Sequence, residues 1–333
     1  MARRKMNKIE PAVQTMTFTN LIIPGGAGAS SDYYIDLSQC ASLANRRFYR
    51  QGLNWAVAGM KFLSSSGASA IVQVQKLPNT WVLSNSWEKS MRAWLRMNNE
   101  AMSESESVRP RFMDFKIYAD LEHHQAGFAA NLVPFAHNLG EWDPSVFQIP
   151  DSTSATGLAN GREIIAVGAN YPGPGASGLD AVSMIEGYAA SRALPDIQDP
   201  NVPTDFHYAD GPIPQNWLQA TFNEGTEQIG EVLDDLSGAN RIAPYPFEGD
   251  PTNIDTMYPG GANNAAGLQL HDQEYITPTT IGGTTRLKGG NFPCGLLKIS
   301  GVNLGAESVG LTLQLDLVPG NHRGYLCEPM TEM

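Results

Sequence analysis

The sequence predicts an all-β fold, a sandwich of two antiparallel sheets or a jelly roll, and three observations lead to it. The chain of 333 residues contains 33 Gly and 22 Pro, which favour turns, while only 17% of its residues are charged. A helical bundle or coiled coil would be rich in charge and poor in Gly and Pro. Short segments with alternating apolar and polar residues recur along the chain, as in half-buried strands. Long irregular stretches between them indicate elaborated loops.

Eight segments carry this alternation or a comparable apolar run. In the clearest of them, residues 309–318, the apolar side chains recur at every second position from Val309 to Leu317. Side chains two residues apart in a strand lie on one face, so this segment buries one face and exposes the other. About eight such strands predict two packed sheets in one domain. The expected strands are 15–23, 33–37, 54–63, 70–76, 113–118, 268–276, 296–299 and 309–318.

We expect only one or two short helices beside these strands. Residues 38–47 are compatible with a helical turn. Residues 86–97 predict an amphipathic helix, because Trp87, Met91 and Trp94 recur at helical spacing. Asn85 and Glu88 resemble a capping box, and Glu88 can pair with Arg92 one turn later.

The predicted domain organisation is simple. A basic arm, residues 1–10, precedes one domain, residues 11–333, with long loop insertions at about 120–162 and 170–265. The second insertion is strongly acidic, with twelve acidic residues and one basic residue in 196–258. Loops of this length in a compact domain usually carry function or build surfaces.

The charge is distributed unevenly. The formal net charge is −12, yet residues 1–116 hold 15 basic and 8 acidic side chains, so the acidic excess lies in the remainder. Such asymmetry suggests that the basic part contacts nucleic acid or a membrane surface. No apolar run approaches the length of a membrane span, so we expect no membrane partner. Three cysteines without a CxxC pair favour a reducing compartment.

Seven basic residues are the candidates for nucleic-acid contact. Lys and Arg on an exposed arm bind phosphates without sequence preference, because binding releases counterions. The alternative is that the arm only solubilises the chain and that the arginines of the domain pair with local acids. Tryptophans 55, 81, 87 and 94 could stack on bases, although helical spacing favours core packing for Trp87 and Trp94. The candidates are Arg3, Arg4, Lys5 and Lys8 in the arm and Arg46, Arg47 and Arg50 in the domain.

Other motifs are weaker. Residues 173–178 read G-x-G-x-x-G, but Asn170-Tyr171-Pro172 separates them from the preceding strand, so we expect a glycine-rich loop. His123 and His124 follow Asp120 and Glu122, and we expect a surface loop there, because adjacent histidines diverge and share one metal ion poorly. The set around His271 is similar. We predict no catalytic residue, no cofactor and no metal site.

Four segments resemble capsid proteins of small circular Rep-encoding single-stranded DNA viruses (CRESS-DNA viruses). The resemblance spans nearly the whole chain. It implies a single eight-stranded viral jelly roll with an inward-pointing basic N-terminus. One departure is the arm, because circovirus coat proteins carry a longer Arg-rich one. The segments are Asn45–Gly52 (NRRFYRQG), Thr80–Ser90 (TWVLSNSWEKS), Arg109–Lys116 (RPRFMDFK) and Leu317–Tyr325 (LVPGNHRGY).

The function implied by this resemblance is a non-enzymatic viral coat. About 60 copies would form an icosahedral T=1 shell and package a single-stranded DNA genome. The partners would be copies of the same chain, the DNA and a host surface receptor that the sequence does not identify. The resemblance places the chain in the virion after synthesis in the host cytoplasm, with nuclear assembly as an open alternative. A carbohydrate-binding or carbohydrate-cleaving β-sandwich is the first rival, and a nucleotide-dependent enzyme using residues 173–178 is the second.

Overall fold

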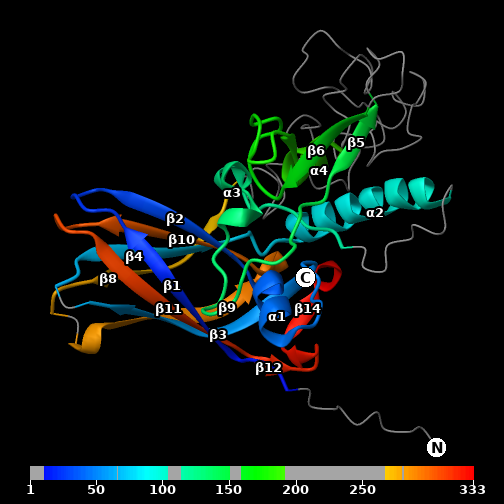
Figure 1. The fold of residues 1–333 in the computed structure, drawn as a ribbon. Helices are drawn as coiled ribbons and strands as arrows, with labels where there is room; N and C mark the ends of the chain where they lie inside the picture. The colour runs from blue at the N-terminus through cyan, green and yellow to red at the C-terminus, as the bar shows by residue number, and fades with distance from the viewer. Residues whose placement is uncertain (1–10, 66, 104–113, 151–158, 192–266, 280) are drawn as a thin grey trace, which may run out of the picture. The chain divides into compact units, whose positions relative to one another are not determined.

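The chain divides into two compact units. The computed structural model describes residues 11–65, 67–103, 114–150, 159–191, 267–279 and 281–333 (Figure 1). Unit 1 consists of Met1–Asn79, Gly127–Asp143 and Leu268–Met333, and unit 2 consists of Thr80–Ala126 and Pro144–Gly267. Unit 2 is therefore an insertion in the sequence of unit 1, interrupted once by the segment 127–143.

Two antiparallel sheets form unit 1. In the first sheet β11 lies between β1 and β3, and β3 also pairs with β9 and β14. In the second sheet the order is β2-β10-β4-β8. The first sheet contains β1 (Thr15–Ile23), β3 (Leu53–Ser64), β9 (Thr284–Phe292), β11 (Val309–Leu317) and β14 (Cys327–Pro329). The second contains β2 (Ser30–Asp36), β4 (Ala70–Lys76), β8 (Gln269–Ile276) and β10 (Leu296–Asn303).

The eight long strands of unit 1 pair by a single rule. Taken in chain order, the first strand pairs with the eighth (β1 with β11) and the second with the seventh (β2 with β10). The third pairs with the sixth (β3 with β9) and the fourth with the fifth (β4 with β8). The first four strands thus pair antiparallel with the last four in reverse order, and two of these pairs lie in each sheet. Pairing of β11 with β3 and of β10 with β4 joins these pairs laterally.

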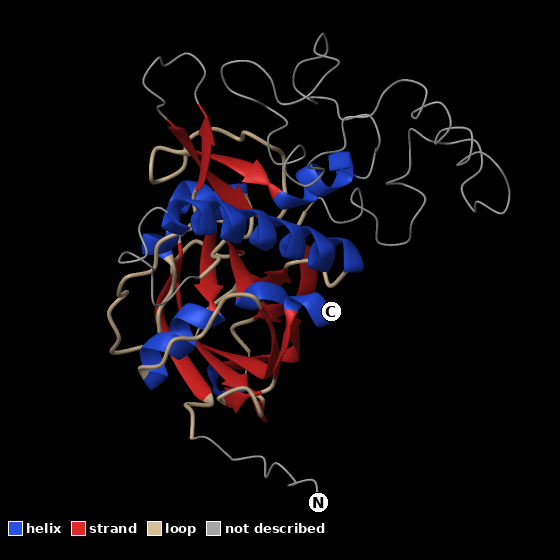
Figure 2. Cartoon of the chain, turned by 90° about the vertical axis from the view of Figure 1, so that its right-hand side faces the viewer, coloured by secondary structure: helices blue, strands red, loops and turns tan. Residues whose placement is uncertain are grey.

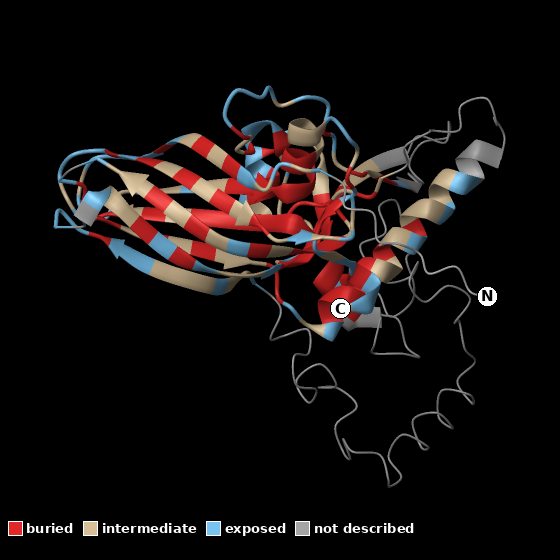
Figure 3. Cartoon of the chain, turned by 90° about the horizontal axis from the view of Figure 1, so that it is seen from below, coloured by how far each residue is buried: buried red, intermediate tan, exposed pale blue. Residues whose placement is uncertain are grey.

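The core of unit 1 lies between the inner faces of its sheets. Leu313 of β11 pairs with Phe18 on one side and with Phe62 on the other, and all three are fully buried. Val72 and Ile299 belong to the same cluster from the second sheet. Buried and more exposed positions alternate along these strands (Figure 3). Each fully buried side chain of this size contributes about 1.5–3 kcal/mol.

Short elements complete unit 1. Helix α1 follows β2 directly, and a two-residue ladder near the C-terminus forms a separate small hairpin. These elements are α1 (Leu37–Asn45), β12 (Pro319–Gly320), β13 (Gly324–Tyr325), η2 (Phe128–Ala130), η4 (Ile281–Gly283), η5 (Pro293–Gly295) and η6 (Met330–Glu332).

The described part of unit 2 combines a small sheet with the helices α2, α3 and α4, and Figure 2 distinguishes helices from strands by colour. The sheet is mixed, because β6 pairs antiparallel with β5 and parallel with β7. Helix α2 is 23 residues long and packs against α4, where Trp81 and Tyr188 are in ring contact at 6.4 Å. The elements are α2 (Trp81–Ser103), α3 (Leu121–Ala126), β5 (Phe147–Pro150), β6 (Ala159–Ile165), β7 (Asp180–Ser183) and α4 (Met184–Ser191).

The predicted β character is confirmed, but the expectation of one or two short helices is wrong. The described residues contain four α-helices, and α2 extends well beyond the predicted 86–97. It begins at Trp81, where the Thr80 hydroxyl accepts a hydrogen bond from the Leu83 amide at 3.3 Å. Asn85 therefore lies inside the helix and is no cap. The buried face includes Ser86, Ser90 and Ala93, so an apolar stripe does not mark it fully.

One of the eight predicted strands is misplaced. In the described part of 113–118 the chain is irregular, with a single bridge from Tyr118 to Ile165. The eighth long strand is instead β9, which the sequence analysis missed. Its alternation is obscured by Gly289 and Gly290, whose lack of a side chain weakens the strand signal.

The predicted loop insertions contain regular structure. Residues 120–162 include α3, β5 and the start of β6, and residues 170–265 include β7 and α4. These elements are four to eight residues long, too short for a strong periodic signal. The acidic segment 196–258 lies outside the described residues.

A buried carboxylate fixes the entry to α1. Asp36 is the N-cap residue, and its Oδ1 accepts hydrogen bonds from the amides of Ser38 (2.8 Å) and Gln39 (3.3 Å). Its Oδ2 accepts from Gln51 Nε2 (3.1 Å) and Trp142 Nε1 (2.9 Å). Burial nevertheless raises the pKa of Asp36 to about 6, and the four hydrogen bonds only limit the rise.

Asp36 should make unit 1 less stable as the pH rises. Because its folded pKa is about 6 and its ordinary value is 3.8, the stabilisation is complete below pH 3.8 and is lost as the pH rises through 6. The lost amount is about 3 kcal/mol at 1.36 kcal/mol per pKa unit. Urea unfolding of the wild type and of Asp36→Asn at about pH 4 and about pH 7 measures it. The stability difference between the two proteins should favour the wild type more strongly at the lower pH.

The matched control is Asp32→Asn, which alters an exposed carboxylate on the same strand. This variant should not change the pH dependence in the direction expected for Asp36→Asn. Identical pH dependences for the wild type and Asp36→Asn would contradict the prediction.

Candidate nucleic-acid interface

Three of the predicted arginines lie together on the loop after α1. The helix ends because Arg46 adopts the left-handed conformation at its C-cap, with φ 52° and ψ 39°. Arg46, Arg47 and Arg50 are exposed, whereas Tyr49 between them is fully buried. The Tyr49 ring contacts those of Trp55 at 5.9 Å and Tyr325 at 5.5 Å. The buried Tyr49 ring thus anchors the loop in the core, and the three arginines on either side of it lie on the surface.

Backbone and side-chain hydrogen bonds hold this loop on both flanks. The Tyr49 amide donates to Ser42 Oγ at 2.9 Å, and Ser38 Oγ donates to the Arg50 carbonyl at 3.1 Å. Gln51 is bound to the Asp36 carboxylate. The arginines therefore project from a loop of fixed shape, which lowers the entropy that they lose on binding a ligand.

A fourth arginine, which the sequence analysis did not single out as a site residue, lies against the loop. Arg323 is exposed, and its Nη1 donates to the Phe48 carbonyl at 2.6 Å. The Tyr49 hydroxyl donates to the Arg323 carbonyl at 3.0 Å. We call Arg46, Arg47, Arg50 and Arg323 the arginine cluster. The only sequence signal for Arg323 is its place in a turn before Gly324, so the fold is needed to find it.

The first described residues of the chain are held beside the end of α1. Arg3, Arg4, Lys5 and Lys8 lie outside the described residues. The chain that follows them is bound at the end of α1, because the Val13 amide donates to Asn45 Oδ1 at 2.9 Å. The Tyr325 hydroxyl donates to the Val13 carbonyl at 2.7 Å.

The described residues provide no carboxylate partner for Arg46 or Arg50. Ion pairs in this part of the chain join Arg92 to Glu88, His124 to Glu163 and Lys298 to Asp32. Among the described residues, the alternative of local acid pairing therefore has no support for these two arginines. Cations at the C-terminal end of α1 interact with the helix dipole, typically by about 0.3–1 kcal/mol, which is less than the cost of about 1–2 kcal/mol of the left-handed conformation for a residue with a Cβ.

Most of the candidate tryptophans are not available to bases. Trp55 is fully buried, and Trp87 is 5% exposed and in ring contact with Phe115 at 6.0 Å. Trp94 is partly buried and contacts the same ring at 5.9 Å. The predicted core packing of Trp87 is confirmed. Trp81, which is 37% exposed, belongs to unit 2.

The basic residues of α2 are engaged within unit 2. Arg92 pairs with Glu88 one turn away, as predicted. Lys89 Nζ lies 5.3 Å from the centre of the Tyr188 ring, and burial lowers the pKa of Lys89. These side chains and Asn85 line an open hollow of about 430 Å³.

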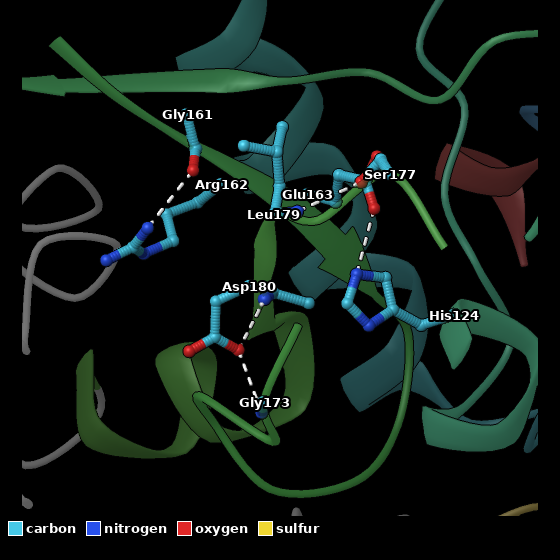
Figure 4. A network of polar contacts seen from close by, with 9 residues as sticks. His124, Gly161, Arg162, Glu163, Gly173, Ser177, Leu179 and Asp180 are labelled. Atoms are coloured by element: carbon cyan, nitrogen blue, oxygen red, sulfur yellow. Dashed lines mark hydrogen bonds and ion pairs between the residues drawn. The ribbon is translucent and has the colours of Figure 1, made fainter. Parts of the chain in front are cut away.

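The glycine-rich loop 173–178 belongs to unit 2, and most of its residues are exposed (Figure 4). Its amides are bound by the protein itself, since Gly173 donates to Asp180 Oδ1 at 3.0 Å and Gly175 donates to the Leu179 carbonyl at 2.8 Å. Strand β7 follows the loop directly. A dinucleotide site needs free amides at a helix N-terminus, so the predicted glycine-rich loop describes this segment better than a cofactor fingerprint.

The expected surface loop at His123 and His124 is wrong. Both residues belong to α3 and are fully buried. His123 Nδ1 accepts a hydrogen bond from the Ala119 amide at 3.0 Å, and His124 Nε2 lies 2.8 Å from Glu163 Oε2. His124 and Glu163 of β6 are far apart in the sequence, so the local sequence around His124 could not predict this buried pair.

The described part of the chain contains no group of three His, Cys, Asp or Glu side chains that could hold a metal ion. His271 Nε2 lies 3.0 Å from the Lys288 carbonyl, and Asp272 Oδ2 accepts from the Lys288 amide at 2.9 Å. This pair therefore links β8 to β9. No helix among the described residues is both long and apolar enough to cross a membrane.

Comparison of the chain with protein-family models, with curated proteins and with solved structures yields no match. The functional argument therefore depends on the fold of unit 1 and on the arginine cluster.

Gly175→Ala should destabilise unit 2 through His124. A Cβ at position 175 would lie 2.5 Å from His124 Nε2, and overpacking of this kind costs about 1–3 kcal/mol. The cost should fall in a His124→Asn background, where the smaller side chain makes room and still offers a donor. Urea unfolding of the four proteins of this cycle measures the coupling.

Gly310→Ala is the matched control, because a Cβ at this position on β11 meets nothing within 4 Å. It should leave stability nearly unchanged. An equal cost of Gly175→Ala in both backgrounds would show that the ring of His124 is not the obstacle.

Proposed function

We propose that this chain is a viral capsid protein with a jelly-roll domain and without catalytic activity. About 60 copies would assemble into an icosahedral T=1 shell around single-stranded DNA. The basic arm and the arginines of the loop after α1, Arg46, Arg47 and Arg50, would face the interior of the virion and bind phosphates.

The strand pairing in unit 1 is the observation that carries this proposal. Pairing of the first strand with the eighth, and so on inward to the fourth with the fifth, is the connectivity expected when a long hairpin is rolled into two sheets. Jelly rolls of eight strands occur in viral capsid and lectin domains. The two sheet orders support a jelly roll over other two-sheet sandwiches.

The second support is the position of the positive charge. The chain that follows the arm is held beside the loop of Arg46, Arg47 and Arg50, since the Val13 amide donates to Asn45 Oδ1. In a shell of 60 copies, the four basic residues of each arm supply about 240 positive charges, and the three arginines of each loop add about 180. Phosphate contacts of this kind carry no sequence information, as packaging of a whole genome requires.

The proposed rival is a carbohydrate-binding or carbohydrate-cleaving β-sandwich, because lectins share the two-sheet architecture. Exposed arginines beside a basic arm suit a polyanion better than a neutral sugar. Assembly state separates the two functions directly.

Sizing and electron microscopy of the expressed full chain should show closed particles. With a chain mass of 36.0 kDa, a shell of about 60 copies has a mass of about 2 MDa, and pentameric pieces are the expected smaller species. An absorbance ratio reports the nucleic acid inside. A protein that stays monomeric at neutral pH, with or without added DNA, would refute the capsid function.

Deletion of residues 2–8 should leave shells that form but protect less DNA from nuclease. The arm supplies about half of the charge counted above, so protected DNA should fall by roughly half. Replacement of Arg3, Arg4, Lys5 and Lys8 by Gln at constant length separates charge from chain length. Unchanged DNA content in both variants would show that the arm is not the packaging element.

A further inference from the structure

Two members of the arginine cluster have a backbone conformation that favours glycine. Arg46 has φ 52° and Arg323 has φ 51°. Six non-glycine residues among those described have positive φ, and two of them, Arg46 and Arg323, belong to the arginine cluster. The left-handed region is disfavoured for any residue with a Cβ, and such strain gathers at functional sites.

Their surroundings do not call for arginine on structural grounds alone. Arg46 is a C-cap residue, a position where glycine is the commonest choice. Arg323 lies in the turn between β12 and β13, where the His322 amide donates to the Tyr325 carbonyl at 2.9 Å. Gly324 beside it also has positive φ, so the turn already uses one glycine.

The turn and the loop hold each other at this point. The Phe48 carbonyl accepts one N–H of Arg323, and the Arg323 carbonyl accepts the Tyr49 hydroxyl. A guanidinium carries five N–H donors in a rigid plane, so the bond to Phe48 orients the group and leaves donors for a ligand. Bidentate binding of phosphate oxygens is the interaction that this geometry favours.

We infer that Arg323 is part of the same phosphate-binding site as Arg46, Arg47 and Arg50, and that arginine stands at 46 and 323 for binding rather than for folding. The inference rests on the proposed function, because its ligand is the backbone of single-stranded DNA. It adds to that function a residue 273 positions after Arg50 in the sequence, and it explains the strained backbone at both positions.

The test replaces each strained arginine by glycine in the full chain. Arg46→Gly and Arg323→Gly remove the charge and relieve the backbone, so a role in binding alone predicts weaker binding without lower stability. Arg323→Gly also removes the hydrogen bond to the Phe48 carbonyl, which offsets part of the relieved strain. Binding of a short labelled oligothymidylate is measured by fluorescence anisotropy over a range of salt concentrations, and thermal unfolding is recorded for each protein.

Each variant should bind more weakly and unfold no earlier than the wild type. One lost phosphate contact lowers the slope of log K against log salt by about 0.7 and the affinity about five-fold at 0.1 M salt. Arg323→Gly should lose at least this much, because the loop also loses its tether at Phe48. Arg323→Lys keeps a cation and should recover most of the salt slope.

Arg286→Gln is the matched control. This exposed arginine of β9 lies opposite Lys61, about 20 Å along β3 from Trp55, which pairs with Cys327 near the cluster. Its loss should leave binding unchanged.

The outcomes separate the inference from the proposed function. If the wild-type chain binds no oligothymidylate, the proposed packaging function fails, and the inference fails with it. If the wild type binds and Arg323→Gly binds equally well, only the inference fails. A fall in the thermal midpoint of both glycine variants would show that the arginines serve the fold, which also overturns the inference.

Discussion

The carboxylate of Asp36 is the constraint on which the basic end of unit 1 depends. It is fully buried, and its four donors come from three separate stretches of chain: the first turn of α1, the loop after α1 and the segment 127–143. A buried carboxylate that lost these donors would cost free energy. The folded state of unit 1 therefore requires all three stretches to stay in place around Asp36. Gln51 directly follows Arg50, so the position of the arginine loop is set by an acidic group beneath it.

Tyr49 and Tyr325 extend this constraint to the two ends of the chain. Their rings are in contact, and their hydroxyls bind the backbone at Arg323 and at Val13. Burial raises the pKa of Tyr325 to about 12, so the hydroxyl keeps its proton and remains a donor throughout the physiological range. The start of the described chain, the loop after α1 and the C-terminal turn are thereby held together, and the four exposed arginines lie on the last two of these segments.

Sequence periodicity predicts strands well where one face is buried and the other is solvated. The strand ending at Leu317 and the segment 70–76 are examples. Periodicity fails where small or polar residues occupy the buried face, as Ser86 and Ser90 do in α2, and where glycines interrupt the pattern, as in β9. Three of the four members of the arginine cluster fall within five residues of one another, so the sequence alone suggests them as candidates. Arg323 could not be found in this way, because only the pairing of β3 with β14 and the contact with Phe48 bring it to the loop.

The insertion of unit 2 between β4 and β8 has a consequence for how the chain folds. These strands are hydrogen-bonded neighbours, yet about 190 residues separate them in sequence. Closing a flexible loop of that length costs roughly 5 kcal/mol of chain entropy. If unit 2 condenses first, its compact form brings its own ends closer and reduces this cost. This separation is the shortest of the four, because β4 and β8 are the innermost of the nested pairs. Closure of β4 on β8 therefore lowers the remaining entropy cost for β3 with β9, β2 with β10 and β1 with β11.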